Sequence, residues 1–334
     1  MKKTCVLGAG SWGTALALVL AENNNKVSLW TLNEEQKNVI NNDRSNEKYL
    51  PGIYIHDNIT ATCSIEDAVK DSEVILLAVP SQAIRGVCQK IKHLIKPNQI
   101  IVNVAKGLER STGLRLSEVV GEEIENVRFV VLSGPSHAEE VALKLPTTIT
   151  VASKDINDAI KVQDIFMNNY FRVYTNSDII GVELGGTLKN IIAFGAGICD
   201  GVGYGDNTKS ALITRGLAEI KRLGISLGAK EETFSGLSGV GDLIVTCTSK
   251  HSRNRKAGML IGSGKNLEET LEEVQMVVEG IVATEVAYKL SESVGVEMPI
   301  TKAIYSILYN GISAKDAVEE LMARDGKCEK IDAI

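Results

Sequence analysis

The sequence predicts a doubly wound α/β sheet in its first half and an all-α domain in its second half. The first half alternates short apolar runs, typical of buried strands, with helix-like segments. The first of these runs passes through a glycine-rich turn directly into an apolar helix. After about residue 178 the pattern is helical throughout. A chain of 334 residues has room for two domains, which we expect at 1–180 and 181–334.

The glycine-rich turn carries the first functional signal. An apolar run at 5–7 leads into a GxGxxG motif at 8–13 and then into an apolar helix from Thr14. In this order Gly8 permits the tight turn, Gly10 lets the backbone approach a pyrophosphate, and Gly13 lets the helix pack against the strand. The helix start favours phosphate charge, so the pattern predicts a Rossmann-type dinucleotide site. The alternative is a turn that serves packing alone.

Further strands are expected at 27–31, 74–79, 100–104, 129–132, 147–152 and 171–174. They are largely apolar on both faces, which indicates a parallel sheet covered by helices on both sides. Ligands bind at the carboxyl ends of such strands. The segments 80–81, 106–107 and 134–136 follow strands and are therefore candidate ligand contacts.

The second half reads as helices joined by glycine-rich segments at 201–205 and 236–241. The domain boundary is expected within 178–190. The expected helices span 181–199, 210–223, 254–261, 267–277, 282–290, 302–308 and 314–322.

Composition excludes several classes of protein. Hydrophobic residues make up 44% of the chain and aromatic residues only 4%, so the core is aliphatic. A net charge of −6 argues against general nucleic-acid or membrane-surface binding. No segment reaches the ~18 apolar residues of a membrane span, and no signal-peptide pattern is present. We expect a cytoplasmic protein.

The cysteines and histidines are scattered. The absence of CxxC fits reduced, buried thiols, and the absence of HExxH and of paired Cys/His spacing argues against zinc. The residues concerned are Cys5, Cys63, Cys88, Cys199, Cys247, Cys328, His56, His93, His137 and His251.

Lys189 lies in a helix that is apolar around much of its circumference. Gly185, Ala193 and Gly197 share its face at i, i+4 spacing, and such small neighbours would leave room around one ammonium. Burial and a nearby cation would lower the pKa of this lysine and suit it to proton transfer. The alternative is a lysine that reaches solvent or pairs with a structural acid.

Three further residues are candidates for chemistry. Lys106 follows a buried strand and could polarise a carbonyl, although an ordinary loop lysine would look the same. Ser136 is expected to start a helix, with Glu139 completing a capping box, and to face the ligand. Asp242 ends the glycine-rich segment 236–241 and could orient a lysine ammonium, or simply cap a turn.

The segment 252–256, Ser-Arg-Asn-Arg-Lys, opens a helix and is well built to hold a phosphate. The alternative is a solvated basic face. No GxSxG motif and no P-loop lysine occur, which argues against hydrolases and kinases.

Together these segments resemble bacterial NAD(P)-dependent glycerol-3-phosphate dehydrogenase over essentially the whole chain. The segments that carry the resemblance are 8–17, 105–108, 133–136, 188–190, 239–243 and 252–254, in that order. The resemblance implies reversible hydride transfer between NAD(P)H and dihydroxyacetone phosphate, giving sn-glycerol 3-phosphate for glycerophospholipid synthesis. It also implies a homodimer.

The resemblance assigns roles to individual residues. Lys189 is the implied proton donor or acceptor, Lys106 a second substrate-binding lysine, and Asp242 the acid that holds them. The implied cofactor contacts are Gly8, Gly10, Ser11, Trp12, Gly13, Lys106, Ala138, Arg253, Val277 and Glu279. The implied substrate contacts are Lys106, Gly134, Ser136, Lys189, Asp242, Ser252, Arg253 and Asn254.

One departure concerns the cofactor. NADPH-using members usually carry a basic residue just after the second strand, where this chain has Trp-Thr-Leu-Asn-Glu-Glu at 30–35. No acid stands at the strand end either, where an NAD enzyme would hold the ribose 2′-hydroxyl. The sequence therefore favours use of NADH or of both cofactors.

Two other functions stay open on the sequence. A related two-domain dehydrogenase of another small acid would share the turn but has less need of the segment 252–254. A cofactor-binding sensor without catalysis would keep the glycines but has no need of Lys106, Lys189 and Asp242 together.

Overall fold

The structure, a computed structural model, describes residues 2–326 and 329. The described residues divide into two compact units. The sheet unit holds the residues up to 109 together with 114–183, and the helical unit holds 110–113 together with the residues from 184 onward. Cys328 lies outside the described residues.

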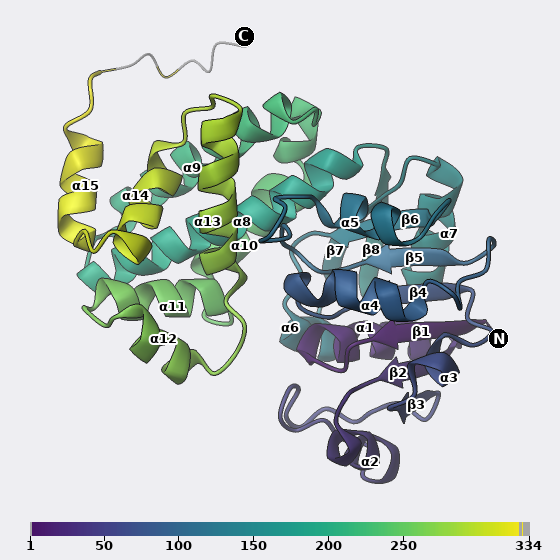
Figure 1. The fold of residues 1–334 in the computed structure, drawn as a ribbon. Coiled ribbons are helices and arrows are strands. Elements are labelled where there is room, and N and C mark those ends of the chain that lie inside the picture. The colour runs from purple at the N-terminus through teal and green to yellow at the C-terminus, as the bar shows by residue number, and fades with distance from the viewer. Residues whose placement is uncertain (1, 327–328, 330–334) are drawn as a thin grey trace. The chain divides into compact units, whose positions relative to one another are not determined.

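In the sheet unit, strands and helices alternate along the chain (Figure 1). Its strands are β1 (Lys3–Leu7), β2 (Lys26–Trp30), β3 (Ile59–Thr62), β4 (Val74–Leu77), β5 (Ile100–Asn103), β6 (Arg128–Ser133), β7 (Thr147–Ala152) and β8 (Phe171–Asn176). Its helices are α1 (Ser11–Glu22), α2 (Glu34–Asn42), α3 (Ile65–Val69), η1 (Ser81–Ala83), α4 (Ile84–Ile91), α5 (Leu116–Glu123), α6 (Ala138–Ala142), α7 (Ile156–Phe166) and the start of α8 (Ile179–Val202).

Within the described residues the strands form one eight-stranded sheet in the order β3-β2-β1-β4-β5-β6-β7-β8. The doubly wound α/β class is thereby confirmed, but the expectation of a wholly parallel sheet is wrong at one place. β7 runs antiparallel to β6, because the connection between them holds only the five-residue helix α6. So short a helix does not carry the chain back along the sheet, as a parallel crossover requires. An apolar strand reads the same in either direction.

The sequence pattern missed β3, which pairs parallel with β2 at the edge of the sheet. Only Ile59 and Ala61 of its four residues are buried, and threonines occupy the other two positions. A short edge strand of this kind lacks the continuous apolar run that marked the central strands.

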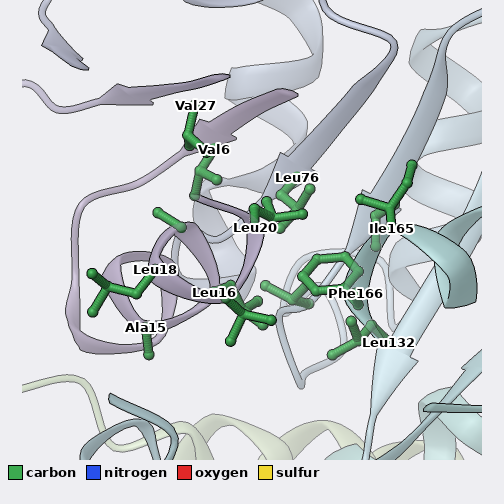
Figure 2. Packing of buried hydrophobic residues seen from close by; sticks show 14 of the residues in the cluster. Val6, Ala15, Leu16, Leu18, Leu20, Val27, Leu76, Leu132, Ile165 and Phe166 are labelled. Carbon is green, nitrogen blue, oxygen red and sulfur yellow. The ribbon is translucent and has the colours of Figure 1, made fainter. Parts of the chain in front are cut away.

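Alternate residues of each central strand enter two hydrophobic clusters, one on each face of the sheet. One cluster joins Val6 and Leu76 to α1 and α7, where Leu16 and Phe166 pack together (Figure 2). The other cluster joins the neighbouring strand residues to α3, α4 and α5. Burial on both faces explains why these strands are apolar throughout.

The helical unit begins inside α8 and contains helices and short turns (Figure 1). Its further elements are α9 (Asp206–Ser226), η2 (Glu231–Ser235), a π-helical turn η3 (Leu237–Gly241), α10 (Asp242–Thr248), α11 (Arg253–Gly262), α12 (Leu267–Val274), α13 (Glu279–Ser293), α14 (Pro299–Tyr309) and α15 (Ala314–Met322).

Helices α8 and α11 touch backbone to backbone through glycines. A Cβ placed on Gly197 would lie 2.0 Å from the carbonyl oxygen of Arg255, and one on Gly258 would lie 1.9 Å from that of Phe194. Gly201 and Gly262 make the same kind of contact one turn further along. Because no side chain could occupy these positions, the residue types on the two helices determine how closely they pack.

The expectation that no segment could span a membrane was wrong as stated. By length and composition, α8 is long and apolar enough to cross a bilayer. However, 94% of its apolar window is buried inside the structure. The hydrophobicity of this 24-residue helix is therefore that of a helix in the core of a protein.

Candidate functional site

The three glycines of the turn between β1 and α1 have different surroundings. A Cβ on Gly8, whose φ is +122°, would lie 2.5 Å from the carbonyl oxygen of Ala78, and one on Gly13 would lie 1.9 Å from that of Gly8. A Cβ on Gly10 would meet nothing within 4 Å. Gly8 and Gly13 therefore close the turn, whereas Gly10 presents bare backbone to open space at the start of α1.

This turn fits a dinucleotide pyrophosphate. The first turn of α1 contains no acidic residue, so the amide groups and dipole of the helix face no competing negative charge. The indole Nε1 of Trp12 is buried and has no hydrogen-bond partner among the described residues. Open backbone at the start of a helix is what a phosphate-bearing ligand would complete.

The residues that follow β2, where the cofactor ribose is expected, form hydrogen bonds and an ion pair among themselves. Asn33 caps α2 by accepting a hydrogen bond from the backbone N–H of Gln36 at 2.8 Å. Lys37, the first cation after the strand, forms an ion pair with Glu34. The hydrogen bond from Lys37 lowers the pKa of Glu34, and the same bond raises the pKa of Lys37. Both side chains therefore stay charged at neutral pH.

At the carboxyl ends of β5 and β6 the structure brings three expected residues together. The ammonium of Lys106 donates to the carbonyl oxygen of Gly134 at 3.0 Å. The hydroxyl of Ser136 donates to the same oxygen at 2.9 Å. The capping box expected at Ser136 and Glu139 is wrong, because α6 begins one residue later with His137 at its N-cap. Ser136 uses its hydroxyl on the turn instead. Ala138, the first residue of α6, is buried in the core.

In the helical unit Lys189 and Asp242 form a buried ion pair. The lysine ammonium also donates to the hydroxyl of Thr246 at 2.6 Å, and this hydroxyl donates to the backbone carbonyl of Asp242 at 2.6 Å. Lys189 is 5% exposed and Asp242 is 1% exposed. Such a desolvated, hydrogen-bonded pair holds the ammonium at a defined point.

The small residues beside Lys189 do not leave the space that the sequence suggested. A Cβ on Gly185 would lie 2.5 Å from the carbonyl oxygen of Ser238, so backbone occupies that side of α8. Gly197 is filled in the same way by α11. Gly185 admits the segment that leads into α10, and Asp242 at the start of that helix pairs with the ammonium.

The start of α11 gathers most of the expected phosphate-binding residues. Ser252 caps the helix by accepting from the backbone N–H of Arg255 at 3.2 Å. Arg253 donates to the carbonyl oxygen of Val277 at 3.1 Å, which joins two expected cofactor contacts. Two residues further, Glu279 begins α13.

Asn254 is used as an internal link. Its side-chain nitrogen donates to the side-chain oxygen of Asn190 at 2.9 Å, and its oxygen accepts from the backbone N–H of Gly280 at 2.9 Å. Asn254 therefore connects α11 to α13 and to α8, where its partner Asn190 directly follows Lys189 in the chain. The backbone N–H of Asn254 lies in the first turn of α11, where N–H groups have no acceptor within the helix and can bind an anion.

The sequence pattern assigned no role to Thr246 or Asn190, although both take part in the hydrogen bonds of this site. Thr246 stands four residues after Asp242 on α10, so both project from one side of that helix. Asn190 follows Lys189 directly. A polar residue in an otherwise apolar helix was a usable signal for Asn190, whereas threonine is too common on helices to have marked Thr246.

Comparison with known proteins decides the family. The models described as NAD-dependent glycerol-3-phosphate dehydrogenase N-terminus and C-terminus match residues 3–159 and 178–319. The chain belongs to this family. Membership confirms the resemblance drawn from the sequence motifs, together with NAD(P) as the cofactor of the family.

Relatives named glycerol-3-phosphate dehydrogenase (NAD(P)+) align along the whole chain. The protein of Clostridium perfringens is 54% identical, with 99% of this chain and 100% of the relative covered. That of Geobacillus kaustophilus is 56% identical over 99% and 97%. The crystal structure of glycerol-3-phosphate dehydrogenase from Coxiella burnetii superposes with a TM-score of 0.93 at 39% identity, covering 97% of this chain and 99% of that one.

Proposed function

We propose that the protein is an oxidoreductase that interconverts dihydroxyacetone phosphate and sn-glycerol 3-phosphate with NAD(P)H. Its product is the backbone precursor of glycerophospholipids. The single observation that carries the proposal is the buried Lys189–Asp242–Thr246 group in a member of this dehydrogenase family. A sensor without catalysis gains nothing from burying an ammonium and a carboxylate, because the desolvation of both charges is costly.

The chemistry needs one hydride and one proton. NAD(P)H bound at the glycine-rich turn would supply the hydride for the carbonyl carbon, and the electron pair of the C=O π bond would then lie on the carbonyl oxygen. Lys189 gives that oxygen its proton, and in the oxidative direction it takes the proton back. Asp242 and Thr246 hold the ammonium in place, so that no reorganisation is needed as negative charge develops.

Asp242 contacts Lys189 as the acid that the resemblance implies. A carboxylate in contact favours the charged form of an ammonium and so opposes the effect of desolvation. We assign Lys189 the role of proton donor when the ketone is reduced. The neighbouring thiol of Cys247 takes no part, because burial raises its pKa to about 12.

The remaining expected residues divide between carbonyl and phosphate. We assign Lys106, held on the turn of Gly134 and Ser136, to polarising the substrate carbonyl. We assign Arg253 and the backbone amides at the start of α11 to the substrate phosphate. Ser252 and Asn254 shape that helix start, through the cap and the link to Asn190.

For the cofactor we propose NADH or dual use. The support is that no arginine or lysine occurs from Thr31 to Gln36, and that Lys37 is already paired with Glu34. A 2′-phosphate would find two acidic residues at the start of α2 and no unengaged cation there. The ratio of kcat/KM for NADH and NADPH measures the preference, and a strong preference for NADPH would contradict it.

We propose further that the protein is a cytoplasmic homodimer without nucleic-acid or membrane partners. The support is the family, the acidic composition, and the free, mostly buried cysteines among the described residues. Sedimentation of the purified protein measures the oligomeric state.

One assay tests the proposed reaction against its alternatives. Purified protein is mixed with NADH or NADPH and dihydroxyacetone phosphate, and cofactor oxidation is followed by absorbance. Turnover with this substrate, and little with small 2-oxo acids, is expected. Turnover with 2-oxo acids only would favour a related dehydrogenase of another small acid. Cofactor binding without turnover of any substrate would favour a sensor.

A further inference from the structure

Two side-chain amides hold the backbone of the glycine-rich turn at one atom. The amide nitrogen of Gln36, on α2, donates to the carbonyl oxygen of Ala9 at 2.7 Å. The amide nitrogen of Asn46, in the loop after α2, donates to the same oxygen at 3.1 Å. Ala9 stands between Gly8 and Gly10, so the bonds act on the peptide that leads into the open face of the turn.

The hydrogen bonds of these two side-chain amides fix the orientation of each amide group. The second hydrogen of the Gln36 amide goes to the side-chain oxygen of Asn46 at 3.1 Å. The second hydrogen of the Asn46 amide goes to the hydroxyl of Thr14 at 2.9 Å. The side-chain oxygen of Gln36 accepts from the hydroxyl of Thr31, the first residue after β2. Neither amide can rotate by 180° without placing like groups against each other.

The network has a consequence for the backbone. In a trans peptide the C=O and the next N–H point in opposite directions, and the described residues contain no cis peptide. Fixing the carbonyl of Ala9 toward Gln36 and Asn46 therefore turns the N–H of Gly10 away from them. Gly10 is the residue whose Cα faces open space. Asn46 is itself 3% exposed, so this orientation is fixed by a buried group.

We propose that Gln36 and Asn46 are positioning residues for the cofactor: they set the direction of the Ala9–Gly10 peptide for the pyrophosphate of NAD(P)H. The inference rests on the proposed function for the identity of the ligand. Because Thr31 belongs to the same network, the end of β2 and the turn are fixed as one piece. The hydroxyl of Ser11 adds a second tie, to the carbonyl oxygen of Tyr49 in the same loop at 2.7 Å.

The test is the isosteric variant Asn46→Asp. It replaces the donor that faces the carbonyl of Ala9 by a carboxylate oxygen, which repels that carbonyl and frees the peptide. We expect the Kd for NADH, measured by fluorescence without substrate, to rise at least about tenfold. The kcat at saturating NADH and the KM for dihydroxyacetone phosphate should stay within about twofold of wild type.

A pH series gives a second readout. When the new carboxyl group takes up a proton at low pH, it can again donate to the carbonyl of Ala9. The Kd of the Asn46→Asp variant should therefore fall toward the wild-type value as the pH is lowered, relative to the wild-type protein at each pH. Should Asn46→Asp fail to fold, Gln36→Glu removes the other donor to the same oxygen and carries the same expectations.

Asn41→Asp is the matched control. Asn41 also lies on α2 and also ties the helix to backbone, donating to the carbonyl oxygen of Ala61 at 2.9 Å and accepting from its N–H at 2.8 Å. Its bonds end on β3 and not on the turn. We expect a comparable loss of thermal stability and an unchanged Kd.

The possible outcomes distinguish failure of this inference from failure of the proposed function. Equal Kd values for the two variants, or a lower kcat with unchanged KM for NADH in Asn46→Asp, would leave only a structural role and overturn the inference. Failure of the wild-type protein to bind either NADH or NADPH would contradict the proposed function instead.

Discussion

At the turn before α1 a glycine leaves the backbone open, whereas the glycines of α8 and α11 let two helices touch. At the turn before α1, Gly10 is open on its Cα side. On α8 and α11, Gly197 and Gly258 are filled by the backbone of the partner helix. The same residue type thus leaves backbone open at one place and permits close packing at the other. In the helical unit a separate close contact, between Gly185 of α8 and the backbone of Ser238, brings the segment before α10 against α8, where Asp242 pairs with Lys189.

The largest effect is expected for Lys189→Ala, which removes the proposed proton donor while both glycine arrangements stay in place. We expect kcat to fall by about 10²–10⁴-fold, since general acid catalysis contributes this much. The Kd for NADH should be unchanged. Lys302→Ala, at an exposed lysine of α14, is the control. Near wild-type turnover in Lys189→Ala would refute the assignment of Lys189.

Gly258→Ala tests the packing use of glycine. The new methyl group would overlap the carbonyl oxygen of Phe194, so α8 and α11 must separate. We expect a loss of about 1–3 kcal/mol or more in the free energy of unfolding, as for overpacked cores. Denaturant titration measures it.

The matched variant for this comparison is Gly86→Ala, in α4 of the sheet unit. A Cβ on Gly86 meets nothing within 4 Å, so the change should stabilise the helix by up to about 1 kcal/mol. Equal effects of the two substitutions would show that α8 and α11 do not depend on close contact.

Each unit also contains a buried glutamate that accepts hydrogen bonds from backbone N–H groups at the start of a helix. Glu183 accepts from the backbone N–H of Ser117 at 2.8 Å and pairs with Arg115 at 2.9 Å. Glu219 accepts from the backbone N–H of Ile300 at 2.6 Å and of Thr301 at 3.1 Å. Burial raises the pKa of both carboxyls, that of Glu219 to about 7.

The raised pKa of Glu219 predicts that the free energy of unfolding depends on pH. Its folded pKa of about 7 lies above its ordinary value of 4.5, so the native state holds a proton that the unfolded state releases. The stabilisation is complete below about pH 4.5 and is lost as the pH rises to about 7, by on the order of 3 kcal/mol. Glu219→Gln should flatten this part of the unfolding profile. An unchanged slope in the variant would show that other groups cause it.

The smallest effect on the fold is expected for Gly10→Ala. Its methyl group would point into open space, so the sheet unit should unfold at nearly the wild-type temperature. The Kd for NADH should rise by about tenfold or more, because a methyl group there keeps the pyrophosphate from the backbone. Unchanged binding of NADH would show that Gly10 does not face the cofactor.

The sequence by itself determined what depends on neighbouring residues. The GxGxxG order and the buried central strands follow from local spacing and apolar pattern, and they were found where expected. The helices expected in the second half were also found, but the one expected over 267–277 ends at Val274, and α10 was not expected. The segments around Lys106, Lys189, Asp242 and Arg253 were recognised as motifs, since each keeps its residues close together in the chain.

Tertiary structure decided what depends on distant partners. The reversal of β7, the choice of Thr246 as a partner for Lys189, and the use of Asn254 as a link to Asn190 arise from contacts that no local pattern encodes. The same holds for the hydrogen bonds of Gln36 and Asn46 to Ala9. A hydrogen bond or a close backbone contact is specified by position in space to within about an ångström, and only the packing of whole elements supplies that precision.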